Sequence, residues 1–172
     1  MITFDAFGEE RATAELILDR VSQRLSQAAE RPARFELCEE HDDAVYAAMG
    51  ELEASVYPSD LAYKPREFRE YVDDEESILL LLRVDGELAG YVFGYPEDPE
   101  GEGQIVEGAD FFVDDGVVAL EWEARGLGTL CSMAVFSLVG LLGFEVVGIT
   151  TEERDAEGRE LVKWYHGLGF ED

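Results

Sequence analysis

Cations are scarce in this sequence. It contains 13 Lys and Arg residues against 40 Asp and Glu, which gives a formal net charge of −27. Binding to a nucleic-acid backbone requires a basic surface, so we expect no nucleic-acid partner. Cysteine and histidine are rarer still, with two of each. The spacing of a zinc site is absent among them, at Cys38, Cys131, His41 and His166. We therefore expect no metal site and no disulfide framework.

Long hydrophobic runs are also missing. The most apolar stretch, residues 127–144, falls short of the ~20 residues of a membrane span and is interrupted by Gly140 and Gly143. The start of the chain, Met1–Asp5, lacks the basic and apolar regions of a signal peptide. We expect a cytoplasmic protein with no membrane partner. Its 172 residues, 47% of them hydrophobic, suit one globular domain.

Apolar residues at helical spacing predict a helix over residues 9–29, with Pro32 just beyond its end. After a short strand at 35–38, a second helix is capped by Asp42 or Asp43 and is stopped by Pro58. Pro65 suits the first turn of a third, short helix.

The clearest local signal is a β-hairpin. Asp85-Gly86 separates two continuous apolar runs, residues 78–84 and 88–95, and glycine accepts the positive φ that a tight hairpin turn requires. Continuous apolar runs indicate strands that are covered on both faces. A further strand spans 110–120, and its centre, Asp114-Asp115-Gly116, has two interpretations. It is either a turn between two short strands or a strand whose carboxylates face a cleft and whose bulge is marked by Gly116.

The C-terminal part is predicted to form a helix over 126–142, a strand over 144–149 and a helix over 159–168. The whole order is therefore four antiparallel strands followed by helix, strand and helix. This order predicts an α+β fold, a mixed α/β sandwich with helices on both faces of the sheet.

The Gly126-Leu127-Gly128 turn stands between a strand and a helix. A helix N-terminus offers unpaired N–H groups and the positive end of its dipole, and glycines let a phosphate approach the backbone. The turn is not a dinucleotide-binding fingerprint, because the third glycine position holds Cys131 and hairpin strands precede it. Alone, it predicts either an anion site or a plain tight turn.

Residues 112–128 resemble the acetyl-CoA segment of the GNAT superfamily of N-acyltransferases, in which the fourth strand runs into a Gln/Arg-x-x-Gly-x-Gly/Ala loop. Residues 161–170, with Tyr165-x-x-x-Gly169-Phe170, resemble the family's final helix. The resemblance runs from Phe35 to Phe170. It implies a sheet splayed between its fourth and fifth strands, in a domain at 33–172 that follows an N-terminal helical extension at 1–32.

The resemblance also implies roles for individual residues. The co-substrate would be acetyl-CoA, which transfers its acetyl group to a primary amine by direct attack in a ternary complex. Tyr165 would be the general acid for the departing thiolate, or else an aromatic residue of the core. The candidate bases are Asp114, Asp115 and Glu152, each of which is otherwise a solvated acidic group. The pantetheine arm would pair with Val117, Val118 and Ala119, and the pyrophosphate would bind the amides of Arg125, Gly126, Leu127, Gly128 and Thr129.

Some positions depart from the family pattern. Glu123 stands at the Gln/Arg position and brings negative charge towards the pyrophosphate, while Leu120 and Gly158 replace a common Pro and Asn. The alternative function is therefore a CoA-binding or interaction module with little or no catalysis. A covalent route through Cys131 has less support, because no histidine or other base lies near it in the sequence.

Relatives continue past the Gly-Phe pair into a closing β-hairpin, whereas this sequence ends at Asp172. The strand at 144–149 would then be an exposed edge, which folded proteins cover. We expect the N-terminal helix or a second subunit to cover it, and we predict a homodimer. The acceptor would be a small-molecule or peptide amine, and the tyrosines and acids of residues 57–64 and 96–108 would suit a cation.

The acidic excess generates a prediction about salt. Self-repulsion strains the folded state at low salt, and molar salt shortens the Debye length to ~3 Å. For a protein of a halophilic cytosol, the melting temperature should rise by about 10 °C or more between dilute buffer and molar KCl. A melting temperature that ignores KCl would favour the alternative, an Arg-biased genome with an ordinary acidic surface.

Overall fold

The computed structural model describes residues 1–40, 42–58, 62–72, 76–101, 104–151 and 160–171. In chain order the elements are η1 (Phe4–Glu10), α1 (Arg11–Ala29), β1 (Ala33–Leu37), α2 (Asp43–Val56), α3 (Pro65–Val72), β2 (Ile78–Val84), β3 (Glu87–Pro96), β4 (Phe111–Val118), η2 (Leu120–Trp122), α4 (Leu127–Leu141), β5 (Val147–Ile149) and α5 (Leu161–Leu168). Within the described residues, no helix is long and apolar enough to cross a membrane.

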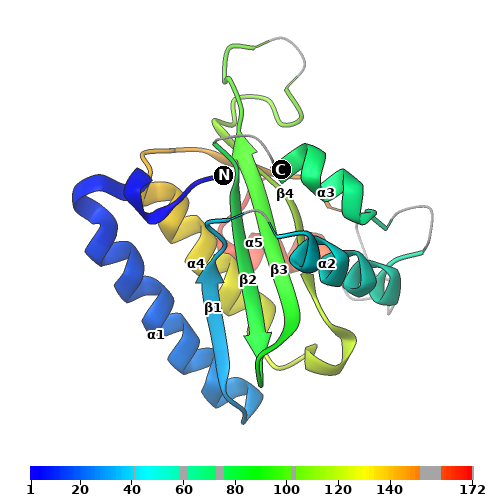
Figure 1. Ribbon diagram of the computed structural model, residues 1–172. Helices are drawn as coiled ribbons and strands as arrows, with labels where there is room; N and C mark the ends of the chain where they lie inside the picture. Colours follow the sequence, from blue (N-terminus) through cyan, green and yellow to red (C-terminus); the bar gives the residue numbers. More distant parts are fainter. Residues whose placement is uncertain (41, 59–61, 73–75, 102–103, 152–159, 172) are drawn as a thin grey trace.

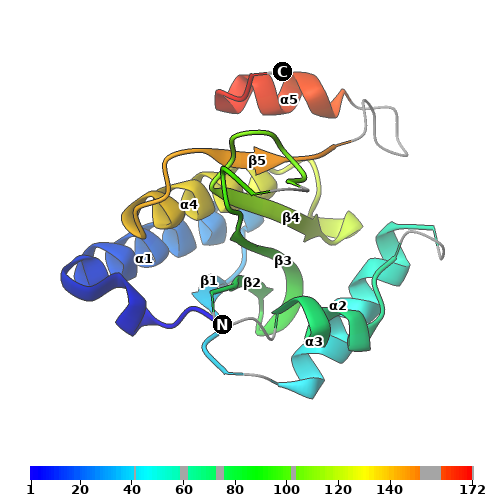
Figure 2. The same ribbon diagram turned by 90° about the horizontal axis from the view of Figure 1, so that it is seen from above.

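The strands form one five-stranded sheet in the order β1-β2-β3-β4-β5 (Figure 1). The first four strands pair antiparallel, and β5 pairs parallel with β4. The helices α1 and α4 cover one face of the sheet, and α2 and α3 cover the other (Figure 2). This arrangement confirms the predicted α+β fold class.

The continuous apolar run of β2 is explained by these two layers. Ile78, Leu80 and Leu82 are buried in the core beneath α1 and α4. The alternate residues Leu79 and Leu81 are buried on the opposite face beneath α2 and α3. Each such aliphatic side chain contributes about 1.5–3 kcal/mol by leaving water, so β2 stabilises both layers at once.

The predicted turn and helix ends are confirmed. Asp85 and Gly86 have φ values of 53° and 88°, the two positive values of a type I′ hairpin turn. Of the two candidate caps for α2, Asp42 is the one in place, because its Oδ1 accepts a hydrogen bond from the Ala44 N–H at 2.8 Å. The helix ends at Val56, ahead of Pro58.

The Asp114-Asp115-Gly116 segment lies within a continuous β4, which resolves its two interpretations in favour of a bulged strand. Phe93 pairs with Asp115, and Gly94 pairs with Val113, so the extra residue is Asp114 and not the glycine. Consecutive strand residues normally point to opposite faces. The bulge breaks this alternation, and both carboxylates bond to tyrosines on the α2/α3 side of the sheet.

The pairing of β4 with β5 is short. It joins Phe111–Val113 to Val147–Ile149 and then stops. Beyond the bulged Asp114, residues 115–118 of β4 pair with β3 alone among the described residues, which is the splay that the resemblance implies.

The fifth strand begins later than the predicted residue 144. The Asp110 carboxylate accepts hydrogen bonds from the N–H groups of Glu145, at 2.8 Å, and Val146, at 2.9 Å. These bonds hold residues 145–146 over the start of β4, while the Phe144 ring packs 5.0 Å from Phe111. The amides of both residues are thus bonded to a side chain, and the pairing with β4 begins at Val147.

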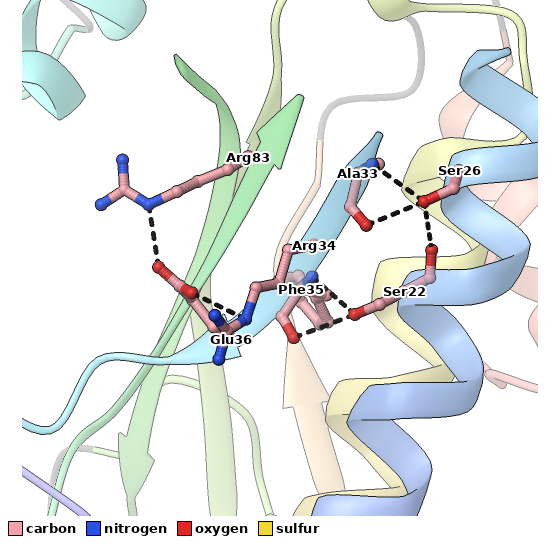
Figure 3. A network of polar contacts seen from close by, with 7 residues as sticks. All are labelled: Ser22, Ser26, Ala33, Arg34, Phe35, Glu36 and Arg83. Atoms are coloured by element: carbon pink, nitrogen blue, oxygen red, sulfur yellow. Dashed lines mark hydrogen bonds and ion pairs between the residues drawn. The ribbon is translucent and has the colours of Figure 1, made fainter. Parts of the chain in front are cut away.

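The N-terminal helix seals the opposite edge of the sheet (Figure 3). Ser22 Oγ accepts a hydrogen bond from the Phe35 N–H at 2.9 Å, and Ser26 Oγ accepts one from the Ala33 N–H at 2.8 Å. The same hydroxyls lie 3.4 and 2.9 Å from the carbonyl oxygens of Phe35 and Ala33. Two serines one helical turn apart thus satisfy the outer groups of β1, where a further strand would otherwise add.

The N-terminal helix does not cover the β5 edge, so that expectation is wrong. It packs on β1 and α4, and β1 lies at the far end of the sheet from β5. Alanine and leucine side chains of α1 are buried in this core, so α1 is fixed there and does not extend to β5. Figure 2 places α5 beyond β5 instead. The homodimer remains a prediction.

The edge seal can be tested by replacing both serines with alanine. Each lost hydroxyl leaves a buried backbone N–H unpaired, which costs about 1–3 kcal/mol. The S22A/S26A variant should therefore unfold at lower urea and scatter more light through edge pairing. Ser137→Ala is the control, since the Ser137 hydroxyl bonds only its own helix, at Met133 O. Equal urea midpoints for the double variant and the control would refute the seal.

Candidate active site

The start of α4 is built to receive an anion. Gly126 precedes the helix with φ 78°, a left-handed conformation that glycine adopts without strain. The first helical bond there runs from the Leu130 N–H to Gly126 O, at 3.2 Å. No side chain of the described residues caps this helix, so its first N–H groups and positive dipole end remain available to a ligand.

Gly128 is not required by the packing of the protein itself. A Cβ there would lie 3.9 Å from Val118 Cγ2, which is an ordinary contact, and its φ is not in the left-handed region. The side-chain space at Gly128 is therefore open, next to the end of β4. A glycine that the fold does not need is consistent with close approach of a ligand to the backbone.

The loop before α4 is anchored by Arg125. Its guanidinium lies 5.0 Å above the Trp122 ring and 3.4 Å from the carbonyl oxygen of Ala29, the last residue of α1. The negative end of the α1 dipole favours a cation there. The Arg125 side chain thus links α1 to the loop, and its backbone amide is a separate candidate group for an anion.

The open edge of β4 offers backbone groups at alternate residues. The Ala119 N–H bonds Ala89 O at 2.8 Å, so the backbone groups of Ala119, and by alternation those of Val117, face β3. The N–H and C=O of Val118 then point away from β3, towards the side that β5 has left. Of the three predicted pantetheine residues, Val118 is the one that presents backbone to the opening.

A buried acid pair lies beside this edge. Tyr91 Oη is 2.6 Å from Asp115 Oδ2 and 2.5 Å from Glu53 Oε1. Glu53 is 1% exposed, and its other oxygen accepts a hydrogen bond from the Tyr63 N–H at 3.0 Å. The Tyr63 hydroxyl lies a long 3.4 Å from Asp114 Oδ2. The structure therefore brings both predicted strand carboxylates into one network of tyrosines.

Burial and mutual repulsion change how these acids titrate. Burial, followed by the charge of Glu53, raises the pKa of Asp115 to about 7. Burial, followed by the charge of Asp115, raises the pKa of Asp114 to about 6, although the hydrogen bond from Tyr63 opposes this shift. A carboxylate that titrates near neutrality beside an opening is suited to general base catalysis.

Tyr165 both packs as an aromatic and faces the acids. Its ring lies edge-on to Trp164, at 4.6 Å, and to Phe170, at 5.7 Å. Trp164 Nε1–H donates to Thr129 Oγ1 at 3.1 Å, which ties α5 to the first turn of α4. Burial, and then the charge of Asp115, raise the pKa of Tyr165, so its proton is retained at neutral pH.

Two other predicted candidates stand apart. Glu152 lies outside the described residues. Cys131 is buried, and desolvation raises the pKa of its thiol to about 12, so it carries no thiolate at neutral pH. Burial and the raised pKa both argue against the covalent alternative.

Sequence reasoning missed Glu53 and Tyr91. Glu53 follows Met49 by four residues and therefore lies on the buried face of α2, a helical spacing that could have revealed it. Tyr91 shares the α2/α3 face of β3 with Phe93 and is hidden within an apolar strand. Its two carboxylate partners come from distant segments, which no local pattern reports.

The fold can now be compared with solved structures. The chain has the fold of the GNAT acetyltransferases. It is similar to the ribosomal-protein-S18-alanine N-acetyltransferase of Escherichia coli, with a TM-score of 0.64, 14% identity, and 81% of this chain and 78% of that one covered. It is also similar to an aminoglycoside acetyltransferase from an uncultured soil sample, with a TM-score of 0.63, 15% identity, and 81% and 90% covered.

A third similar structure is a ribosomal-protein-alanine N-acetyltransferase of Brucella melitensis biovar Abortus 2308, with a TM-score of 0.58, 17% identity, and 81% and 92% covered. No family model matches the chain. No curated protein matches it. The resemblance seen in the sequence is therefore confirmed at the level of the fold.

The buried charge of Asp115 predicts a pH-dependent stability. Its pKa is about 7 in the folded protein, above the ~3.9 of an unfolded aspartate, so folding binds a proton in this window and stability falls as pH rises through it. Asp115→Asn should therefore melt about 5 °C above the wild type at pH 8, and this difference should shrink towards pH 4.

Asp19→Asn on the exposed side of α1 is the matched control, and both variants should be compared in molar KCl. An Asp115→Asn variant that tracks the control at every pH would show that Asp115 ionises normally.

Proposed function

We propose that the protein is an N-acyltransferase that moves an acetyl group from acetyl-CoA to a primary amine by direct attack in a ternary complex. One observation carries this proposal. The unpaired edge of β4 leads to the uncapped, glycine-bearing start of α4, and a carboxyl group that titrates near pH 7 lies on the same strand.

The co-substrate would be held mainly by backbone. The amides of Arg125 and residues 126–129 would bind the pyrophosphate, and Val118 would pair with the pantetheine arm as an added strand does, with Val117 and Ala119 beside it. Similar folds support this proposal, because one aminoglycoside N-acetyltransferase among them is complexed with CoA. A second structure of the same enzyme is complexed with the bisubstrate analogue CoA-S-monomethyl-acetylneamine.

The chemistry requires three proton transfers. An ammonium acceptor gives one proton to a carboxylate of β4, Asp115 or Asp114, and its freed lone pair forms a bond with the thioester carbonyl carbon. The C–S bond then breaks, and its electron pair leaves with sulfur. Tyr165 would give its proton to this thiolate, and its phenolate would take up the second N–H proton, which the acetylated nitrogen loses as it becomes an amide. Glu152 remains a further candidate base.

The acceptor would be a cationic amine. Tyr57, Tyr63 and the two aspartates of β4 surround the opening with aromatic rings and negative charge, which suit an ammonium group. Among the similar folds are enzymes named for aminoglycosides and for a ribosomal-protein alanine, so small-molecule and peptide amines are both acceptor classes to assay.

A CoA-binding module with little or no catalysis is the second candidate. Glu123 favours it, because this carboxylate stands two residues before Arg125 in the loop that leads to the proposed pyrophosphate site. Repulsion there would weaken CoA binding without affecting the acid pair.

The two candidates separate in one pair of measurements, made in molar KCl. Calorimetric titration with acetyl-CoA measures binding, and thiol release with a panel of aminoglycosides, polyamines and peptides measures turnover. Binding with turnover supports the enzyme, and binding without turnover supports the module. No binding at any salt concentration would overturn both.

A substitution tests the position of the co-substrate. Gly128→Glu places a carboxylate where the pyrophosphate would lie and should weaken acetyl-CoA binding by about 100-fold or more, while the fold is kept. Gly140→Glu is the matched control on α4, because a Cβ there meets nothing within 4 Å. If both variants bind as the wild type does, the co-substrate lies elsewhere.

A further inference from the structure

Tyr91 has two acid partners but only one hydroxyl proton. Its oxygen is 2.5 Å from Glu53 Oε1 and 2.6 Å from Asp115 Oδ2. A phenol can donate one hydrogen bond, so the second short contact needs a proton on the carboxyl side. Two ionised carboxylates could not both satisfy this geometry. Glu53, Tyr91 and Asp115 therefore hold one acid proton in addition to the phenolic one.

Glu53 cannot meet a substrate itself. It is 1% exposed on the inner face of α2, and its second oxygen is taken up by the Tyr63 N–H at 3.0 Å. Such a residue acts only through its neighbours. A buried carboxylate next to another acid is costly to the fold, so its presence calls for an explanation other than stability.

We propose that Glu53 is a positioning residue that shares one proton with Asp115 through Tyr91, and that this sharing makes Asp115 the acceptor for the amine proton at neutral pH. This inference rests on the proposed acyl transfer and names the base within it. The two carboxyls behave as a pair, with the proton held jointly, in the manner of other closely spaced acids.

In each catalytic cycle the Glu53–Asp115 pair gains one proton from the amine and releases one proton to water. In the working form both carboxyls are ionised, so the Tyr91 hydroxyl donates to only one of them and the other short contact is given up. The ammonium N–H bond breaks and its proton forms an O–H bond on Asp115, while the nitrogen keeps the electron pair that attacks the thioester. The pair then has the one-proton arrangement seen in the structure. Release of this proton to water restores the working form.

Several other groups lie close enough to Asp115 to be affected by its charge. Asp114 lies next to it on β4, and Tyr63 approaches from the loop before α3. Tyr57 from the end of α2 and Tyr165 from α5 also feel its charge. The tyrosines stay neutral at neutral pH, because burial and the acids raise their pKa values. Among the charged groups, Glu53 is therefore the one whose repulsion raises the pKa of Asp115, whereas Asp114 is itself raised by Asp115.

The test is Glu53→Gln, an isosteric change without the charge. In the wild type, kcat/KM should rise with pH through a midpoint near the value for Asp115, about 7. The glutamine removes a like charge and supplies an N–H donor, and both changes favour an ionised Asp115. The midpoint should therefore fall by about one pH unit or more, and the plateau in kcat should fall with the weaker base.

Glu51→Gln is the matched control, two residues away on the exposed side of α2. It should leave the midpoint unchanged. The KM for acetyl-CoA should be the same in all three proteins, because Glu53 is not near the proposed pyrophosphate site. A Glu53→Gln variant that turns over with the wild-type midpoint would overturn the inference.

A second measurement needs no turnover. Infrared spectra are recorded at about pH 6 in an Asp114→Asn background, because the pKa of Asp114 is itself raised to about 6. At this pH the background protein should contain a protonated carboxyl band, although exposed carboxyls are ionised. Adding Glu53→Gln or Asp115→Asn should remove the band, and adding Glu51→Gln should keep it. Absence of the band from the background protein, or its survival in both site variants, would overturn the shared proton. A band without any turnover would instead overturn the acyltransferase proposal and the catalytic part of this inference.

Discussion

The structure depends on one interruption of hydrogen bonding. β4 pairs with β5 only as far as Val113, and residues 115–118 of β4 keep β3 as their neighbour while their other side is unpaired within the described chain. The bulge at Asp114 falls at this point and turns both carboxylates to the α2/α3 side. The start of α4 then lies beyond the end of the same strand. A backbone opening, an acid and an uncapped helix are thereby brought together.

The outer backbone groups of β1 and those of the part of β4 beyond β5 differ in their partners. At β1, the hydroxyls of Ser22 and Ser26 satisfy the outer backbone groups, so this edge cannot add a strand (Figure 3). At β4, the outer groups are left for a ligand. α1 links the two ends, because its last carbonyl holds Arg125 and so steadies the loop before α4. The N-terminal helix thus contributes both to the edge and to the loop.

Much of the fold could be predicted from local patterns, whereas the acid pair could not. The hairpin at Asp85-Gly86 and the turn at Gly126 follow from backbone conformations that few residues adopt. The strand β5 begins later than predicted, and the Asp110 carboxylate accepts hydrogen bonds from the amides of Glu145 and Val146 just before it. These partners lie 35 and 36 positions apart in the sequence, so no local pattern indicates them. Glu53 and Asp115 come from separate elements that meet only at Tyr91, so their shared proton depends on tertiary packing. The acidic composition hid them further, since 40 acids offer many equal candidates.

The central claim is that the opening between β4 and β5 binds acetyl-CoA through backbone. Amide NMR spectra, recorded in molar KCl during titration with acetyl-CoA, test this claim most directly. The account predicts that the largest shifts occur at Val118 and at residues 126–129, and that the Gly140 amide at the far end of α4 is unaffected. Saturable shifts confined to other parts of the sheet, or no shifts at all, would contradict it.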